Sequence, residues 1–302
     1  MGRRLVLAAV SLLLLLLGQG LQALAQASGA TAGSAETLAQ TAAGQTIRFV
    51  SFGDFGTGAR EQYRVAQAIE NTCKAKGCDF AVTLGDNIYN NGVTGLNDAQ
   101  FQTKFEQPYA RLDFRFHLVL GNHDYRGNVD AQVAYTQQSK KWYLPSRYYH
   151  FNAGPASFFA LDTNQGFEDQ IGYFNKALQQ SDRPWKIVFG HHPRHTNGYY
   201  KNSLSTSQIK LLDSFCGQAD IYLSGHEHNK QHLQTGCLPD YLVVGTGAGY
   251  RAGASGTGTR FYKPTFGFAW FEVSPTRLHF ELYSTQGQQE YSYTRHKDSK
   301  KS

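Results

Sequence analysis

Five short segments of the chain carry an aspartate, asparagine or histidine beside a glycine, each after an apolar run typical of a buried strand. The spacing of His226 and His228 places two imidazoles on the same side of an extended backbone, as metal binding requires. Alone, each segment is weak evidence, because most Gly-Asp pairs are turns and most Asn-His pairs are loop residues. The side chains that follow the five strands are Asp54; Asp86 and Tyr89; Asn122 and His123; His191; His226 and His228.

Taken together, these strand ends predict a metal site. Packing favours apolar residues at such positions, and carboxylates gathered in one place repel each other unless cations are bound among them. The number of donors exceeds what one ion needs. If Asp86 bridges, they divide evenly between two ions and leave positions for water and substrate. The predicted metal ligands are Asp54, Asp86, Tyr89, Asn122, His191, His226 and His228.

The elements that must position these side chains follow from the hydrophobic pattern. Strands are predicted at 46–52, 79–84, 116–120, 157–161, 185–189, 220–223, 241–244, 266–273 and 277–283. Helices are predicted near 59–71, 98–105, 129–138 and 168–180, and after the N-cap residue Ser205. Early alternation of strands and helices, followed by hairpin-like strands, predicts two packed sheets flanked by helices, an α+β or α/β fold. The aromatic segment 142–152 is interpreted as core or strand, with the wall of a substrate cleft as the alternative.

The two ends of the chain differ from its middle. Arg3 and Arg4 precede an apolar run through Leu17, and small residues follow at 23–25. This pattern predicts a secretory signal peptide over 1–25 and a secreted or periplasmic protein. A signal anchor is the weaker alternative, because the apolar run is short for a membrane span. Residues 26–45 are predicted to be a disordered linker, 46–288 the catalytic domain and 289–302 a mobile basic tail.

Net charge and cysteine content indicate which ligands and which disulfides the protein could have. A net charge of +6 suits anionic substrates but is too diffuse to indicate nucleic-acid binding, and nothing in the sequence fixes the oligomeric state. The cysteines are Cys73, Cys78, Cys216 and Cys237. An even number in an exported protein predicts two disulfides with three possible pairings. Cys73–Cys78 and Cys216–Cys237 are favoured because each pair flanks one compact segment. Metal ligation by cysteine is the weaker interpretation.

In this order, between residues 53 and 228, the five segments resemble the sequence blocks of metallophosphoesterases, specifically purple acid phosphatases of the tartrate-resistant type. The first segment lacks the Asp-x-His histidine of other metallophosphoesterases, and the second supplies Tyr89 as an extra ligand. The resemblance implies a four-layer α-β-β-α sandwich of two mixed sheets. It also implies a first ion held by Asp54, Tyr89 and His228, a second held by Asn122, His191 and His226, and Asp86 shared between them.

The chemistry of the two donor sets agrees with that division. Two carboxylates and a phenolate favour Fe3+, whereas an amide with two imidazoles suits a divalent Fe, Zn or Mn ion. The implied reaction is hydrolysis of small phosphate monoesters by a secreted acid phosphatase. Metal-bound hydroxide attacks phosphorus, with Asp86 bridging the ions and His123 protonating the leaving alkoxide. The alternatives are a phosphodiesterase or nucleotidase on the same centre, or a non-catalytic metal- or phosphate-binding protein. No nucleic-acid partner is expected, and no membrane association after signal cleavage.

The substrate-contacting residues are less well defined. Asn122 and His123 are predicted to contact substrate. The family usually has a further substrate-facing histidine in the loop after His191, and this chain has none at that offset. His195 or Arg194 is predicted to substitute, the alternative being that His192 and His195 are ordinary loop residues. Asp124 and Glu227 are predicted to support the site rather than to catalyse.

Overall fold

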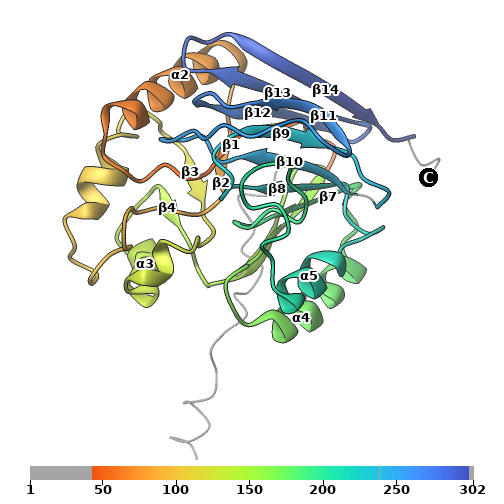
Figure 1. Cartoon of the computed structure of the whole chain (residues 1–302), viewed down its shortest axis with the longest axis horizontal. Helices are drawn as coiled ribbons and strands as arrows, with labels where there is room; N and C mark the ends of the chain where they lie inside the picture. Colours follow the sequence, from red (N-terminus) through yellow and green to blue (C-terminus); the bar gives the residue numbers. More distant parts are fainter. Residues whose placement is uncertain (1–42, 238, 299–302) are drawn as a thin grey trace, which may run out of the picture. The chain divides into compact units, whose positions relative to one another are not determined.

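The computed structural model describes residues 43–237 and 239–298. They form two stacked seven-stranded mixed sheets with helices on the outer faces (Figure 1), which confirms the predicted fold class. The first sheet has the order β14-β13-β12-β1-β2-β3-β4. Its strands are β1 (Ile47–Phe52), β2 (Phe80–Thr83), β3 (Arg115–His117), β4 (Trp142–Tyr143), β12 (Gly267–Ser274), β13 (Arg277–Ser284) and β14 (Gln289–His296).

The second sheet has the order β11-β9-β10-β8-β7-β6-β5. Its strands are β5 (Tyr149–Ala153), β6 (Ala156–Ala160), β7 (Trp185–Phe189), β8 (Ile221–Ser224), β9 (Lys230–Leu233), β10 (Asp240–Val244) and β11 (Thr259–Lys263). Strands β1 to β4 are mutually parallel in the first sheet, as are β6, β7, β8 and β10 in the second. Each sheet therefore has one edge at which several carboxyl ends, and the loops that follow them, come together.

Helices cover the outer faces of the sheets. Trp270 of β12 donates from its indole to the carbonyl of Gly77, the residue after α2, at 3.0 Å. On the second sheet, α4 and α5 lie side by side (Figure 1) and α5 begins at Ser205, which forms a capping box with Gln208 as expected of an N-cap. The helices are α2 (Arg60–Lys76), α3 (Val129–Ala134), α4 (Phe167–Gln180) and α5 (Thr206–Asp213), with the short helices η1 (Gln102–Glu106), η2 (Asp124–Arg126) and η3 (Tyr135–Gln137).

Aromatic rings fill the space between the sheets. Phe49 of β1 stacks on Phe271 at a centroid distance of 4.5 Å and meets Phe158 of the second sheet edge-on at 5.3 Å. The segment 142–152 belongs to this core, because Trp142 and Phe151 are each only 1% exposed. The interpretation of this segment as core and strand is confirmed.

Both predicted disulfides are present. Cys73 bonds Cys78 with their Cα atoms 5.1 Å apart, and Cys216 bonds Cys237 with Cα atoms 5.8 Å apart. Among the described residues no cysteine is free, so none is available as a metal ligand.

The predicted mobile tail is wrong for residues 289–296. They form β14, which pairs antiparallel with β13 along its length. Tyr291 and Tyr293 pack against the core, and Glu290 forms a buried ion pair, so the segment is held by more than its backbone. The predicted signal peptide and residues 26–42 of the predicted linker lie outside the described residues. In the part that is described, no helix has the length and apolar character needed to cross a membrane.

Candidate metal centre

The seven predicted donors lie together where the carboxyl ends of parallel strands from the two sheets meet. Asp54 follows β1, Asp86 follows β2, and Asn122 lies beyond β3 in the first sheet. His191 follows β7 and the His226 segment follows β8 in the second. The hydrogen bonds of these side chains divide them into two groups that share Asp86.

The first group surrounds the hydroxyl of Tyr89. This hydroxyl lies 2.8 Å from Asp86 Oδ2, 3.1 Å from Asp54 Oδ1 and 3.3 Å from His228 Nε2. His228 Nε2 is also 3.2 Å from Asp54 Oδ1. Two carboxylate oxygens, a phenol oxygen and an imidazole nitrogen thus face one small volume. These are the hard donors that suit a trivalent or small divalent ion.

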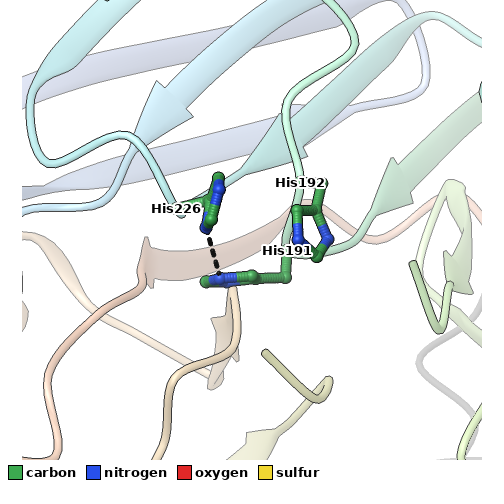
Figure 2. Close-up of side chains that lie close together, drawn as sticks. All are labelled: His191, His192 and His226. Carbon is green, nitrogen blue, oxygen red and sulfur yellow. Dashed lines mark hydrogen bonds between the residues drawn. The ribbon is translucent and has the colours of Figure 1, made fainter. Parts of the chain in front are cut away.

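The second group surrounds Nε2 of His191. This nitrogen lies 3.0 Å from Asn122 Oδ1, 3.1 Å from His226 Nδ1 and 3.5 Å from Asp86 Oδ1. Figure 2 shows the rings of His191 and His226 joined by this contact, with His192 beside them. Asp86 therefore directs one oxygen to each group, which is the position of a bridging carboxylate.

The hydrogen bonds of His191 indicate which of its nitrogens could bind a metal ion. Its Nδ1 lies 2.8 Å from the carbonyl of Leu84, which can only accept, so Nδ1 carries the proton. Burial lowers the pKa of His191 well below its usual value, so Nε2 holds a lone pair. That lone pair lies 3.5 Å from Oδ1 of Asp86, so both atoms could coordinate one cation. The residues present therefore fit a metal ion.

Strained backbone conformations and glycine residues shape the centre. Asp54, Asp86 and His226 have φ angles of 58°, 52° and 63°, a region that costs free energy for residues other than glycine and is concentrated at functional sites. A Cβ atom on Gly225 would lie 2.4 Å from Asp54 Oδ2, and one on Gly121 would lie 2.2 Å from Asp86 Oδ1. The glycines in these segments are therefore required for the carboxylates to fit.

The pKa shifts of Asp86 and Tyr89 without metal also favour a site for cations. Burial, reinforced by the negative charges of Asp54 and Asp124, raises the pKa of Asp86 well above its usual value. Burial and the two neighbouring carboxylates likewise raise the pKa of the Tyr89 hydroxyl. Bound cations oppose both effects, because they stabilise the ionised forms of the ligands.

Asp124 supports the centre from behind, as predicted. It is fully buried, and its carboxylate accepts from the backbone N–H groups of Gly121 at 2.8 Å, Asn87 at 3.1 Å and Ile88 at 3.2 Å. It thereby ties the loop after β2 to the loop after β3. This fixes the relative position of Asp86 and Asn122.

His123 lies at the open side of the centre. Its Nδ1 is 2.6 Å from the carbonyl of Asn90, so this nitrogen is a donor and Nε2 is the nitrogen available to a substrate. Nε2 lies 3.9 Å from Asp86 Oδ2, and the side chain is 22% exposed. The ring packs on that of Tyr89 at a centroid distance of 4.5 Å, which holds its orientation.

The loop after β7 differs from the prediction for substrate contacts. His195 packs edge-on against Tyr241 at 4.6 Å, and none of the hydrogen bonds or ring contacts of the described residues connects it with the seven donors. Arg194 is held by Asp213 through bonds of 2.6 and 3.0 Å. Neither residue occupies the place expected of a substrate contact. His192 lies closer, with its ring 4.5 Å from that of His226 and its Nδ1 held by Thr163 at 2.8 Å.

Two residues beside the centre were missed by the sequence reasoning. Tyr200 stacks on the His226 ring at a centroid distance of 3.9 Å, and its backbone N–H donates to Glu227 at 2.9 Å. Arg251 lies over Tyr199 and Tyr200, with its guanidinium carbon 4.7 and 5.4 Å from the ring centroids. Tyr200 stands at a loop position where only a histidine was sought, and Arg251 follows a glycine-rich turn with no motif, so neither gave a signal.

Comparison with known proteins agrees with this geometry. The family model described as Calcineurin-like phosphoesterase matches residues 47–230, which contain all seven donors. The chain belongs to the calcineurin-like phosphoesterase family. Within it, the chain is 28% identical over 276 residues to purple acid phosphatase 4 of Arabidopsis thaliana, covering 80% of this chain and 81% of the relative. It is 31% identical to tartrate-resistant acid phosphatase type 5 of Sus scrofa, covering 70% of this chain and 72% of the relative.

Solved structures show the same architecture. GAP50, described as the anchor in the inner membrane complex of Plasmodium, superposes with a TM-score of 0.73 at 25% identity, covering 85% of this chain and 90% of GAP50. A purple acid phosphatase from yellow lupin seeds superposes with a TM-score of 0.68 at 19% identity, covering 85% and 55%. The predicted resemblance to purple acid phosphatases, which are metal-dependent phosphoric monoester hydrolases, is confirmed.

Proposed function

We propose that the chain is a secreted acid phosphatase that hydrolyses small phosphate monoesters at a centre of two metal ions. The observation that carries this proposal is the position of Asp86, whose two oxygens face Tyr89 and His191 in separate donor groups. Export is supported by the two disulfides, which persist in oxidising compartments. The predicted signal peptide would direct that export.

The donor chemistry assigns the ions. Asp54, Tyr89, His228 and Asp86 would hold Fe3+, because two carboxylates and a phenolate neutralise a trivalent charge. The second site has Asp86 and three neutral donors, and would hold a divalent Fe, Zn or Mn ion. Those three donors are Asn122, His191 and His226. When bound, the ions would supply a nucleophile of lowered pKa at neutral or acidic pH and neutralise charge on the phosphoryl group.

The protein's own groups would orient the substrate and handle the proton. Asn122 has an amide that can also donate to a phosphoryl oxygen beside the second site. His123 is held by Asn90 through Nδ1, so that Nε2 can give a proton to the leaving alkoxide. Two adjacent residues thus have separate roles. Tyr89 would supply a phenol oxygen to the first ion, and the carbonyl of Asn90 orients His123, the proposed acid.

A non-catalytic role is the second candidate, because the similar structure of GAP50 is described as an anchor rather than as an enzyme. The orientation of His123 favours catalysis over that alternative. A ligand-binding protein has no need of an imidazole whose free nitrogen faces the donor groups at the open side of the centre. A phosphodiesterase or nucleotidase would use the same donors. It would be distinguished from a general monoesterase by the substrates that it hydrolyses.

The test combines metal analysis with turnover. We expect the mature protein to contain close to two metal ions, and to hydrolyse p-nitrophenyl phosphate at acidic pH much faster than bis(p-nitrophenyl) phosphate. Asp86→Ala should lose metal and activity together, whereas Asp113→Ala, at an exposed aspartate outside the two donor groups, should lose neither. Metal-loaded protein without turnover from acidic to neutral pH would favour the non-catalytic role, and faster turnover of the diester would favour a phosphodiesterase.

A further inference from the structure

Three histidine rings lie together at the second donor group. One ring nitrogen of each of His191, His192 and His226 lies within 4.8 Å of a nitrogen of both others. Between centroids, the His192 ring is 5.0 Å from that of His191 and 4.5 Å from that of His226 (Figure 2). His191 and His226 are predicted ligands of the divalent ion, whereas His192 is not among the seven predicted donors.

The backbone of His192 is fixed by its neighbours in the second sheet. Its N–H donates to Oγ1 of Thr163 at 3.1 Å, and its carbonyl accepts from the hydroxyl of Tyr222 at 2.7 Å. A Cβ atom on Gly190 would lie 2.9 Å from both Thr163 Cγ2 and the Tyr222 hydroxyl, so a larger residue there would displace one of them. These contacts hold His192 where its ring lies against that of His226.

One nitrogen of the His192 ring is occupied and the other is free. Nδ1 lies 2.8 Å from Oγ1 of Thr163, a hydroxyl that can accept a hydrogen bond from Nδ1–H. In that tautomer Nε2 carries a lone pair, and among the described residues Nε2 has no hydrogen-bond partner. Metal-bound histidines commonly have this arrangement, in which an acceptor orients the ring through the nitrogen that does not bind the ion. An apolar side chain could fill the same space, so packing alone does not account for an imidazole here.

We propose that His192 is a third histidine ligand of the divalent ion, binding through Nε2, and that it makes the second site select zinc over manganese. Imidazole nitrogens suit zinc, whereas manganese prefers carboxylate, carbonyl and water oxygens, so an added imidazole widens the difference between the two ions. The inference rests on the proposed two-ion centre and chooses among its divalent ions. The protein ligands of the second ion would then be Asp86, Asn122, His191, His192 and His226.

A crystal structure of wild-type protein loaded with Fe3+ and Zn2+ tests the ligand directly. Anomalous scattering at the zinc edge locates the zinc ion separately from iron. We expect Nε2 of His192 at about 2.0 to 2.1 Å from zinc, the usual length of a zinc–imidazole bond. A distance too long for a bond would overturn the proposal. This measurement needs neither turnover nor a variant that must fold.

Metal affinity supplies the second arm. The Kd of the second site for Zn2+ and for Mn2+ is measured by competition with a chelator, in iron-loaded wild type, His192→Phe and His195→Phe. His195 is the matched control, because it belongs to the same loop but its ring packs on Tyr241. We expect His192→Phe to weaken zinc binding about 100-fold and manganese binding far less, and His195→Phe to weaken neither. Thr163→Val, which removes the acceptor for Nδ1, should weaken zinc binding about tenfold.

The outcomes separate a ligand from a residue that only supports its neighbour. Equal weakening of zinc and manganese by His192→Phe would show that His192 only positions His226, and an unchanged zinc affinity would show that it binds no metal. Either result overturns the proposal. Zinc bound by all three histidines in a protein that hydrolyses no ester would confirm the ligand and refute the proposed function. Turnover by a protein whose zinc is bound without His192 would do the reverse.

Discussion

Replacing Glu290 with glutamine tests whether the carboxyl-terminal strand holds the two sheets together. Glu290 in β14 of the first sheet pairs with Lys230 in β9 of the second, and their side chains are 2% and 0% exposed. Lys230 also donates to the carbonyls of Tyr283 at 3.0 Å and Phe266 at 3.3 Å. Burial already lowers the pKa of Lys230, and only the neighbouring carboxylate opposes that effect.

The expected cost follows from what remains after the substitution. Glutamine keeps the shape of Glu290 but leaves the Lys230 ammonium buried without a counter-charge, which costs about 3 to 5 kcal/mol in comparable pairs. A domain is stable by only about 5 to 15 kcal/mol, so the loss is a large fraction of the total. Lys263, 3.2 Å from Glu290, is more exposed and can turn to water, so it should add little to the cost.

Urea unfolding of the metal-loaded protein measures this cost. Glu168→Gln serves as the control, because the Glu168–Lys210 pair is also within hydrogen-bonding distance, at 2.8 Å, but is more than half exposed and should contribute less than about 1 kcal/mol. The double variant Lys230→Met/Glu290→Leu should recover much of the stability, since no charge is left buried. If Glu290→Gln unfolds at the same urea concentration as the control, β14 does not clamp the sheets and the reasoning fails.

Three further predictions concern the site and the pH dependence. Tyr89→Phe should abolish the visible absorption band of the iron-loaded protein, because that band needs a phenolate on Fe3+; a band that persists in the spectrum would remove Tyr89 from the ligand set. His123→Ala should reduce turnover of alkyl phosphates about 100-fold or more and that of p-nitrophenyl phosphate much less, since nitrophenolate leaves without a proton; equal losses in steady-state assays would argue against the acid role. Burial raises the pKa of Asp98, but hydrogen bonds from Gln100 and Thr94 outweigh it and lower the pKa to about 2. Because the folded pKa lies below the unfolded one, this stabilisation is present above about pH 4 and is lost as the pH falls through 2. Asp98→Ala should therefore lower the free energy of unfolding by about 1 to 2 kcal/mol at pH 7, a figure reduced for solvent screening. The difference in thermal stability between the variant and wild type should shrink as the pH is lowered toward 2.

The centre could be predicted from the sequence because each donor is tied to a local pattern. Asp54, Asp86 and His191 each follow an apolar strand within a few residues, and parallel strands place their carboxyl ends at one edge. The glycines beside them mark positions where a Cβ would collide with a donor. Local propensity and global topology thus give the same answer here. The division of donors around Asp86 is what the resemblance to purple acid phosphatases implies, and the chemistry of the two donor sets agrees with it.

The strands β9, β11 and β14 could not be predicted in the same way. Lys230 and His232 in β9 are polar yet fully buried, and β14 carries charged and polar residues along most of its length. A pattern of hydrophobicity does not reveal them, because their burial depends on partners distant in the sequence. Glu290 gains its role only through Lys230, sixty residues away, and His232 through Tyr291 at 2.9 Å.

The same reasoning explains why Tyr200 and Arg251, which lie beside the centre, were missed. Metal ligands are constrained by the ion, so their residue types and spacing can be recognised in the sequence. Tyr200 contacts the ring of His226 and lies under Arg251, which is fifty-one positions away in the sequence. Contacts of this kind can change without loss of the metal centre.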